Sequence, residues 1–217
     1  MTTRAELVAN LRERGLRDER VLAAIDLVPR ELFVPTELRA KAYDDRALPL
    51  GHGATISQPF MVAAICSLLE LKGGERVLDV GTGSGYQAAV LAELAAEVVT
   101  IERIPALADG ARSALAEAGY DRVEVRLGDG TLGAADRSPF DAIAVAAAAP
   151  EPPPALVEQL APEGRLVVPV GGRRGQRLAV IRRSGDELLT TRSVACRFVP
   201  LVGSGGFVEQ PGWDPTP

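Results

Sequence analysis

The spacing of apolar residues changes character about a third of the way along the chain. Apolar positions recur at helical spacing over residues 4–15 and 19–28, and they predict two helices. Residues 29–51 are interrupted by prolines and predict irregular chain that wraps a surface. A third helix is expected over residues 59–71, directly after a loop. The first third of the chain therefore predicts a helical and irregular extension.

From residue 76 onward, short apolar runs alternate with helical patterns. Such alternation is typical of right-handed strand–helix–strand units, which build a parallel sheet with helices on both faces. Strands are predicted over residues 76–80, 97–102, 122–127, 140–148 and 165–171, and helices over residues 86–96, 105–119 and 153–164.

The C-terminal part has no helical pattern between its strands. Residues 176–183 and 188–201 read as two strands joined by a turn, and they predict an antiparallel pair at the edge of the sheet. The expected fold class is α/β, with a Rossmann-like doubly wound sheet that is mostly parallel. This sheet has an antiparallel C-terminal edge strand and helices on both faces, and it follows an N-terminal helical extension.

Length and composition favour one domain. The chain has 217 residues, of which 47% are hydrophobic and 24% charged, as in ordinary globular proteins. We expect a single domain over residues 1–217, with an extension at 1–75, a core at 76–203 and a loose tail at 204–217. No apolar run approaches the roughly 18 residues of a membrane span, and the N-terminus has no apolar leader pattern.

Cysteine, histidine and charge content narrow the setting and the partners. Cys66 and Cys196 lie in apolar patterns and predict reduced core residues in a cytoplasmic chain. One histidine and no cysteine cluster argue against a transition-metal site. The formal charge is −5, and the eight arginines of residues 165–197 favour a solvated hairpin over a duplex-binding surface. We also expect a monomer that binds neither nucleic acid nor a membrane.

A glycine-rich loop follows the first predicted strand of the core. It reads Gly81-Thr82-Gly83-Ser84-Gly85, and glycines at this place let the backbone approach a ligand closely. Its G-x-G-x-G spacing differs from the dinucleotide fingerprint G-x-G-x-x-G. Asp79, inside the preceding strand, suits an ammonium group better than a phosphate. These features favour S-adenosylmethionine over NAD as the cofactor.

Two further strand ends carry acidic residues that support this interpretation. Glu102 ends the next predicted strand, where a carboxylate accepts hydrogen bonds from both ribose hydroxyls. Gly128-Asp129-Gly130 follows the third strand, where the aspartate is placed to accept the exocyclic amine of adenine. Because the three features lie on one edge of the sheet, the sequence predicts an S-adenosylmethionine-dependent methyltransferase.

The methyl acceptor is inferred from what the site lacks. Residues 146–150 read AAAAP, without the polar and aromatic residues that methyltransferases of nucleic-acid amines carry there. A carboxylate acceptor is already ionised at neutral pH and needs only orientation and partial desolvation. The loop at residues 51–60, GHGATISQPF, offers the hydroxyls of Thr55 and Ser57 for this purpose. Ser57 is also placed to cap the following helix, and His52 is expected to pack locally.

The chain resembles the protein-L-isoaspartate O-methyltransferases from about residue 29 to residue 203. The resemblance rests on LPLGHGATISQPFMVA, VLDVGTGSGYQAAVLAEL, VVTIER, GDGTLG, PFDAIAVAAAAP, LVEQLAPEGRLVVPVG and RFVPLVG. It implies methyl esterification of isoaspartyl carboxylates in damaged proteins and peptides, which initiates repair through a succinimide. By position, Ser57 is the catalytic residue, and the neighbouring Ala54, Thr55 and Ile56 border the cofactor. The same resemblance implies that Gly81, Gly83, Glu102 and Asp129 bind the cofactor.

Two positions depart from the family pattern and keep other functions open. Ala54 stands where many members have glutamine, and Ala146 stands where threonine is frequent. A related carboxyl methyltransferase acting on a biosynthetic peptide or a small acid is therefore the main alternative. A non-catalytic module that binds S-adenosylmethionine is a second alternative, although the glycine loop and Ser57 are both intact.

Overall fold

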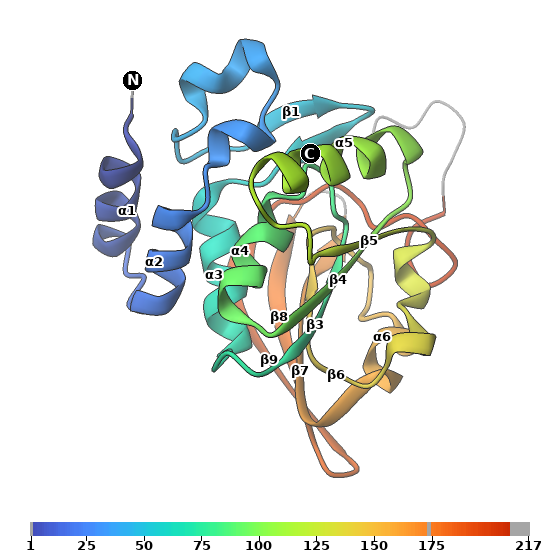
Figure 1. Cartoon of the computed structure of the whole chain (residues 1–217). Coiled ribbons are helices and arrows are strands. Elements are labelled where there is room, and N and C mark those ends of the chain that lie inside the picture. The colour runs from blue at the N-terminus through green and yellow to red at the C-terminus, as the bar shows by residue number, and fades with distance from the viewer. Residues whose placement is uncertain (1, 173–174, 209–217) are drawn as a thin grey trace.

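The computed structural model describes residues 2–172 and 175–208, and Figure 1 shows a central sheet covered by helices. The main sheet consists of β3 (Arg76–Val80), β4 (Glu97–Glu102), β5 (Glu124–Leu127), β6 (Phe140–Val145), β7 (Leu160–Gly172), β8 (Gly175–Ser184) and β9 (Glu187–Cys196). The strands lie in the order β5-β4-β3-β6-β7-β8-β9.

The strand order contains one reversal that positions a site. The chain proceeds from β3 outward to β4 and β5, then crosses back so that β6 lies on the other side of β3. Strands β3 to β7 pair in parallel, whereas β8 and β9 are antiparallel to their neighbours. The predicted mostly parallel sheet with an antiparallel edge is confirmed. A ligand crevice is expected outside the carboxyl ends of β3 and β6, where the order reverses.

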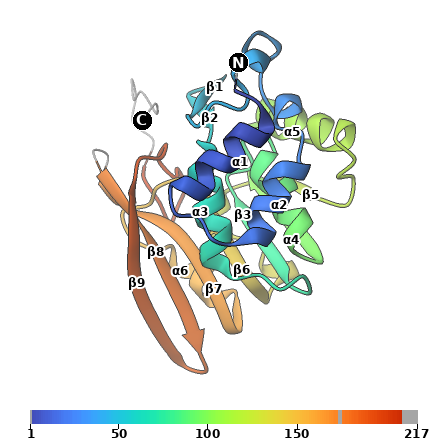
Figure 2. The same ribbon diagram turned by 90° about the vertical axis from the view of Figure 1, so that its left-hand side faces the viewer.

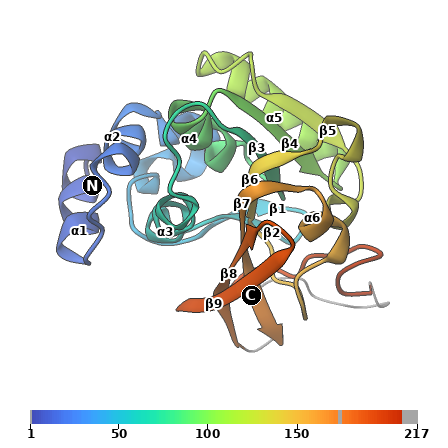
Figure 3. The ribbon, with the colours of Figure 1, turned by 90° about the horizontal axis from the view of Figure 1, so that it is seen from below.

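Helices cover both faces of the sheet, as predicted (Figure 3). One face packs against α3 (Pro59–Leu69), α4 (Tyr86–Leu94) and Leu115 of α5 (Pro105–Glu117). The other face packs against Leu156 of the short α6 (Pro154–Glu158). Alternate strand residues point to opposite faces, as the pleat of a strand requires. The first face buries Val77, Val98, Ala142, Val167 and Val180, and the second buries Leu78, Val99, Ile143, Leu166 and Ile181.

The N-terminal extension forms a further layer outside α3 and α4 (Figure 2). It begins with α1 (Arg4–Glu13) and α2 (Glu19–Leu27), which are followed by 3-10 turns at Arg30–Phe33 and Thr36–Lys41. Asp18 caps the second helix, because its side chain accepts hydrogen bonds from the backbone at the start of α2.

The helix predicted over residues 153–164 is wrong in its second half. Helix α6 ends at Glu158, and β7 already begins at Leu160, which pairs with Phe140 of β6. A Cβ on Gly164 would lie 2.8 Å from the Ala161 carbonyl oxygen, so the chain turns tightly there instead of continuing a helix. Three predicted strands are also too long, since β5 begins at Glu124, β6 ends at Val145 and β9 ends at Cys196.

The loop predicted around residues 51–58 is partly a β-hairpin. It pairs β1 (Leu48–Gly51) with β2 (Ala54–Ile56) in antiparallel fashion. His52 and Gly53 form the connection, with φ values of 52° and 69°. Two consecutive residues with positive φ are the geometry of tight hairpin turns.

The structure bears on two predictions from the sequence, one about membrane spans and one about the cysteines. Within residues 2–172 and 175–208, no helix has both the length and the apolar character needed to cross a bilayer. Cys66 is buried in α3 and Cys196 is half-buried at the end of β9, and both are free thiols. Burial raises the pKa of Cys196 to about 11. The tail expected from residue 204 is described only as far as residue 208, and residues 209–217 lie outside the described chain.

Candidate functional site

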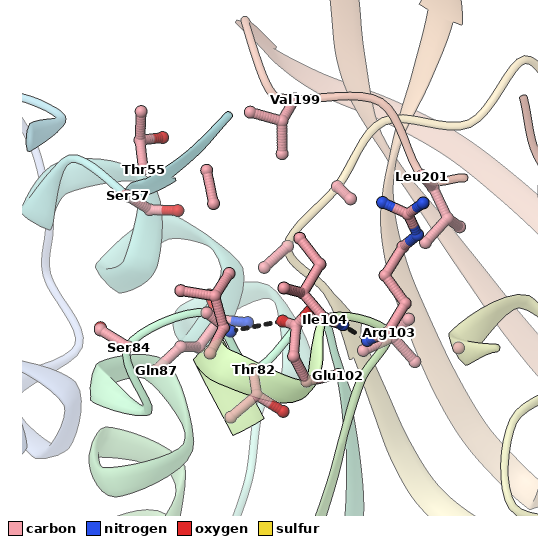
Figure 4. A pocket seen from close by; sticks show the side chains of 18 of the residues that line it. Thr55, Ser57, Thr82, Ser84, Gln87, Glu102, Arg103, Ile104, Val199 and Leu201 are labelled. Carbon is pink, nitrogen blue, oxygen red and sulfur yellow. Dashed lines mark hydrogen bonds between the residues drawn. The ribbon is translucent and has the colours of Figure 1, made fainter. Parts of the chain in front are cut away.

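A pocket lies at the carboxyl ends of β3, β4 and β6, where the strand order reverses (Figure 4). The β1–β2 hairpin, the glycine loop, the end of β4 and the segment at residues 199–202 form its walls; we call it the central pocket. It brings together most residues singled out from the sequence: Ala54, Thr55, Ile56, Ser57, Gly81, Thr82, Gly83, Ser84, Glu102 and Gly130. The predicted residues Asp79, Gly85, Gly128 and Asp129 are not among those that line it.

The glycine loop is held against the end of β4. The backbone N–H groups of Gly81 and Thr82 donate to the carbonyl oxygen of Ile101, at 2.9 and 3.2 Å. Gly81 and Gly83 have φ values of 93° and 54°, which favour glycine. Gly85 has a φ of 90° and a structural role, because a Cβ there would lie 3.2 Å from Cγ of Leu115 in α5.

Glu102 is a buried carboxylate that is already oriented by the backbone. Its Oε2 accepts a hydrogen bond from the N–H of Gly83 at 2.9 Å. Its Oε1 accepts from the N–H groups of Arg103 and Ile104 at 2.9 and 3.0 Å. A carboxylate has about four acceptor positions, so these three bonds leave one for a ligand. The predicted role of Glu102 as the acceptor for ribose hydroxyls stays a prediction, and this arrangement leaves room for one such bond.

Asp79 lies behind the glycine loop and not in the pocket. Its Oδ1 accepts from Nε2 of Gln87 at 2.7 Å, and its Oδ2 accepts from the hydroxyl of Thr100 at 2.8 Å. Thr100 is in turn 2.6 Å from the hydroxyl of Thr82 in the loop. Burial raises the pKa of Asp79 to about 6, against the opposing effect of its two hydrogen bonds. Asp79 therefore braces the loop from below, and direct contact with an ammonium group is not supported.

Gln87 is a polar pocket residue that was not predicted from the sequence. Asp79 fixes its Nε2, and its Oε1 is buried without a hydrogen-bond partner among the described residues. An unsatisfied acceptor in a pocket wall suits a donor such as an ammonium group. Its position eight residues after Asp79, in the first turn of α4, was the available signal. Together with Glu102, it gives the pocket two side chains with an unused acceptor position.

Asp129 ties the turn after β5 to a distant segment. Its Oδ1 accepts from the N–H of Thr131 at 2.9 Å, and its Oδ2 accepts from the N–H of Ser204 at 2.8 Å. These bonds anchor the segment that continues from the pocket wall at residues 199–202. The predicted contact between Asp129 and adenine therefore stays a prediction, and Gly130 is the member of this turn that lines the pocket.

Ser57 presents its hydroxyl toward the central pocket, with Thr55 beside it on the same hairpin (Figure 4). The expected helix cap by Ser57 is wrong, because Gln58 is the N-cap residue of α3. Asp45 accepts the N–H of Phe60 at 2.9 Å instead. Within the described residues the Ser57 hydroxyl forms no hydrogen bond, which leaves it free to donate to a ligand.

A second pocket adjoins the first at Ser57. The two pockets share Thr55, Ser57, Ala146 and Val199. The adjoining pocket extends toward the end of β9 and is lined further by Arg14, Ala47, Gln58, Phe60, Met61, Val194, Ala195, Cys196, Arg197 and Phe198. Its walls are both polar and apolar, as a groove for a peptide requires. Ser57 therefore lies where the central pocket meets the adjoining pocket.

His52 occupies the tip of the hairpin at the rim of the central pocket. It is exposed, and its positive φ places it in the turn rather than among the pocket acceptors. The expectation of a local structural role is compatible with this position.

Known proteins of one family are similar to this chain over most of its length. A family model described as protein-L-isoaspartate(D-aspartate) O-methyltransferase matches residues 2–206. A protein-L-isoaspartate O-methyltransferase of Methanoculleus marisnigri is 52% identical over 206 residues, covering 94% of this chain and 93% of that protein. A protein with the same description from Roseiflexus castenholzii is 52% identical over 207 residues, covering 95% of each chain.

A solved structure extends the match to the ligand. It is a protein-L-isoaspartate O-methyltransferase from Plasmodium falciparum in complex with S-adenosyl-L-homocysteine. It is 26% identical with a TM-score of 0.81, and the alignment covers 93% of this chain and 99% of that one. The glycine loop, the oriented Glu102 and the free Ser57 hydroxyl thus occur in a chain that belongs to the protein-L-isoaspartate(D-aspartate) O-methyltransferase family.

Proposed function

We propose that this chain transfers a methyl group from S-adenosylmethionine to the free α-carboxylate of L-isoaspartyl residues in proteins and peptides. The observation that carries the proposal is the unpartnered Ser57 hydroxyl at the junction of the two pockets. Family membership over most of the chain supports the same reaction. The methyl ester formed in this way is the species from which a succinimide closes.

The central pocket holds the cofactor. When bound, S-adenosylmethionine supplies a methyl group on a positively charged sulfur. Glu102 would accept one ribose hydroxyl through its single remaining acceptor position, and Oε1 of Gln87 would accept the amino group. The backbone of residues 81–84 passes close to the ligand because two of these residues are glycines with positive φ.

Ser57 orients the acceptor carboxylate. The carboxylate is ionised at neutral pH, so no base is required to generate the nucleophile. The Ser57 hydroxyl donates a hydrogen bond to one carboxylate oxygen and thereby aims the other at the methyl group. A misplacement of about 1 Å costs on the order of 10²-fold in such an in-line transfer. The chain on either side of the isoaspartyl residue lies in the adjoining pocket.

We further propose that the enzyme is a cytoplasmic monomer that folds as one domain and binds neither nucleic acid nor membranes. Two free cysteines and a formal charge of −5 support this setting. Sedimentation velocity of the purified chain tests the oligomeric state, with 22.8 kDa as the expected mass.

The activity is tested with two hexapeptides that differ only in an isoaspartyl or an aspartyl residue, using cofactor labelled in the methyl group. We expect base-labile label on the isoaspartyl peptide and background on the aspartyl control, because only an isoaspartyl residue presents a free α-carboxylate within the chain. Equal labelling of both peptides, or labelling of a small acid but of neither peptide, contradicts the proposal.

A further inference from the structure

Arg30 is the largest fully buried side chain of the described protein, with a relative exposure of 0%. It begins the 3-10 turn at Arg30–Phe33, directly after Pro29. Arginine is rarely buried completely unless it is paired, so its environment calls for an explanation.

The contacts of Arg30 connect it to Ser57. Its Nη2 donates to the carbonyl oxygen of Ser57 at 2.8 Å, and its Nε donates to the carbonyl oxygen of Ala42 at 2.8 Å. Its Cζ lies 4.5 Å from the ring centroid of Tyr86, a residue that lines the central pocket. The guanidinium therefore lies beneath the backbone of the residue that orients the acceptor.

The charge of Arg30 is not neutralised by a carboxylate. No acidic group among the described residues forms an ion pair with it, and the acceptors beside it, two backbone carbonyls and the Tyr86 hydroxyl, are neutral groups. Asp45 acts on it electrostatically, but that carboxylate binds Arg14, Gln58 and the N–H of Phe60. Burial lowers the pKa of Arg30, yet arginine remains protonated at neutral pH.

We propose that Arg30 is a positioning residue for the acceptor carboxylate: it holds the Ser57 backbone, and its buried positive charge is balanced by the substrate. The proposal rests on the function proposed above. A carboxylate bound at the Ser57 hydroxyl contacts the same residue whose carbonyl oxygen accepts a hydrogen bond from Arg30. Attraction between charges is strong in a site of low dielectric and is little screened by salt.

The reaction itself removes this attraction. Methyl transfer breaks the carbon–sulfur bond and forms a carbon–oxygen bond, so the carboxylate becomes a neutral ester without any proton transfer. Arg30 therefore stabilises the bound substrate more than the transition state or the product. Such an interaction lowers KM without raising kcat, and it favours release of the ester.

The test compares two ligands that differ only in charge. Binding of an isoaspartyl hexapeptide and of the matching isoasparagine peptide, whose α-carboxamide is neutral, is measured by calorimetry with S-adenosylhomocysteine present. The wild-type enzyme is expected to prefer the carboxylate. Arg30→Gln is expected to lose at least tenfold of this preference and to raise KM. We expect kcat to change less, because loss of the attraction to bound substrate favours turnover whereas loss of the contact to the Ser57 carbonyl opposes it. A purely structural role would weaken both peptides equally.

Arg183→Gln is the matched control. Arg183 is a half-buried arginine of β8 that donates to the carbonyl oxygen of Val157 at 2.9 Å, and it lines neither pocket. It is expected to keep the wild-type preference. Retention of the full preference in Arg30→Gln overturns the proposal.

Arg30→Lys covers the case in which the neutral variant fails to fold, which circular dichroism would reveal. The lysine keeps the charge and loses one of the two carbonyl contacts, so it should keep the preference for the carboxylate while kcat falls. Loss of the preference in a folded Arg30→Lys overturns the proposal. The wild-type rates on isoaspartyl and aspartyl peptides judge the proposed function separately, because they do not depend on any Arg30 variant.

Discussion

At the scale of single residues, the Glu102 carboxylate and the Ser57 hydroxyl differ in whether other groups of the protein already bind them. Glu102 is fixed by three backbone N–H groups before any ligand binds. Ser57 is fixed through its backbone carbonyl, which Arg30 contacts, while its hydroxyl stays free. Preorganised acceptors suit a cofactor with a constant shape, and a free donor suits an acceptor that differs between substrates.

Ser57→Ala is expected to lower turnover of the isoaspartyl peptide by about 10²-fold, because the acceptor carboxylate loses its orienting donor. Cofactor affinity and melting temperature should change little, since Ser57 does not cap α3. Initial rates, calorimetry with S-adenosylhomocysteine and thermal melting provide the three readouts. Ser113→Ala, which removes an exposed hydroxyl of α5, is the control. Wild-type turnover in Ser57→Ala would exclude the residue from the reaction.

Glu102→Gln is expected to weaken cofactor binding at least tenfold. The amide retains one acceptor atom but loses the charge-assisted bonds, each worth about 1.5–3 kcal/mol. Glu97→Gln is a matched control, because Glu97 begins the same strand and forms half-buried ion pairs with Arg76 and Arg137. Affinities for S-adenosylhomocysteine are compared by calorimetry. Equal affinities of the two variants would remove Glu102 from the cofactor site.

The site residues that were predicted from the sequence differ from those that were missed in what places them at the site. Glu102 and the glycine loop were predictable because the carboxyl ends of parallel strands meet at one edge. Gln87 and Arg30 were not, because their roles depend on hydrogen bonds to partners brought near by folding. Asp79 was predicted to contact the ligand. In the structure its hydrogen-bond partner Gln87 lines the pocket instead.

At the scale of elements, the glycine loop combines two different demands for glycine. A Cβ on Gly83 would make ordinary van der Waals contact with Cδ1 of Leu50, at 3.7 Å, without a clash. Gly85 is confined by Leu115 and Ala111 of α5. The first glycine therefore serves the ligand, and the second lets α4 and α5 pack closely.

Gly85→Ala is expected to lower the free energy of unfolding by more than Gly119→Ala does. Both residues have positive φ, 90° and 82°, which costs an alanine about 1–2 kcal/mol. Only at Gly85 does the new Cβ meet a buried side chain, 3.2 Å from Cγ of Leu115, and overpacking adds about 1–3 kcal/mol. Urea unfolding of both variants measures the difference. Equal losses would mean that α5 moves aside without cost.

The elements that were predicted wrongly lie where tertiary contacts decide. The hairpin was taken as a loop because its turn is His52-Gly53 rather than one of the strong turn pairs such as Asn-Gly. Residues 160–164 continued a helical pattern, yet Leu160 pairs with Phe140 and so begins a strand. Pairing with a distant strand cannot be read from local periodicity.

At the scale of the whole molecule, the alternation of strands and helices was sufficient to predict the sheet and its helical layers. It did not reveal that β6 crosses back beside β3. That crossing places residues 146 and 147 opposite the glycine loop and so completes the central pocket. The site is thus a property of strand order, which depends on contacts distant in sequence.

The buried Asp79 makes overall stability depend on pH. Its pKa is raised to about 6, whereas an unfolded aspartate titrates near 4, so the folded state binds more protons between these values. Wild-type stability should therefore fall relative to Asp79→Asn as pH rises from 4 to 7, by on the order of 2 kcal/mol. Urea unfolding across this range measures the change.

Asp136→Asn should show the opposite sign. Hydrogen bonds from Arg126 hold the pKa of Asp136 below its usual value, so its contribution to stability is present above pH 4 and is lost on acidification. Wild-type stability should therefore rise relative to this variant as pH increases. If the two stability differences changed with pH in the same direction, the raised pKa of the buried Asp79 would be contradicted.

The three amides that hold Glu102 belong to two different segments, the glycine loop and the start of α5. Their hydrogens are shielded by one carboxylate, so each opening fluctuation of that group exposes all three to solvent deuterium. A ligand that bridges to Glu102 suppresses this opening for both segments together. Mass-spectrometric deuterium uptake around residues 83, 103 and 104 should therefore slow in unison when S-adenosylhomocysteine is added, although the residues lie about twenty positions apart.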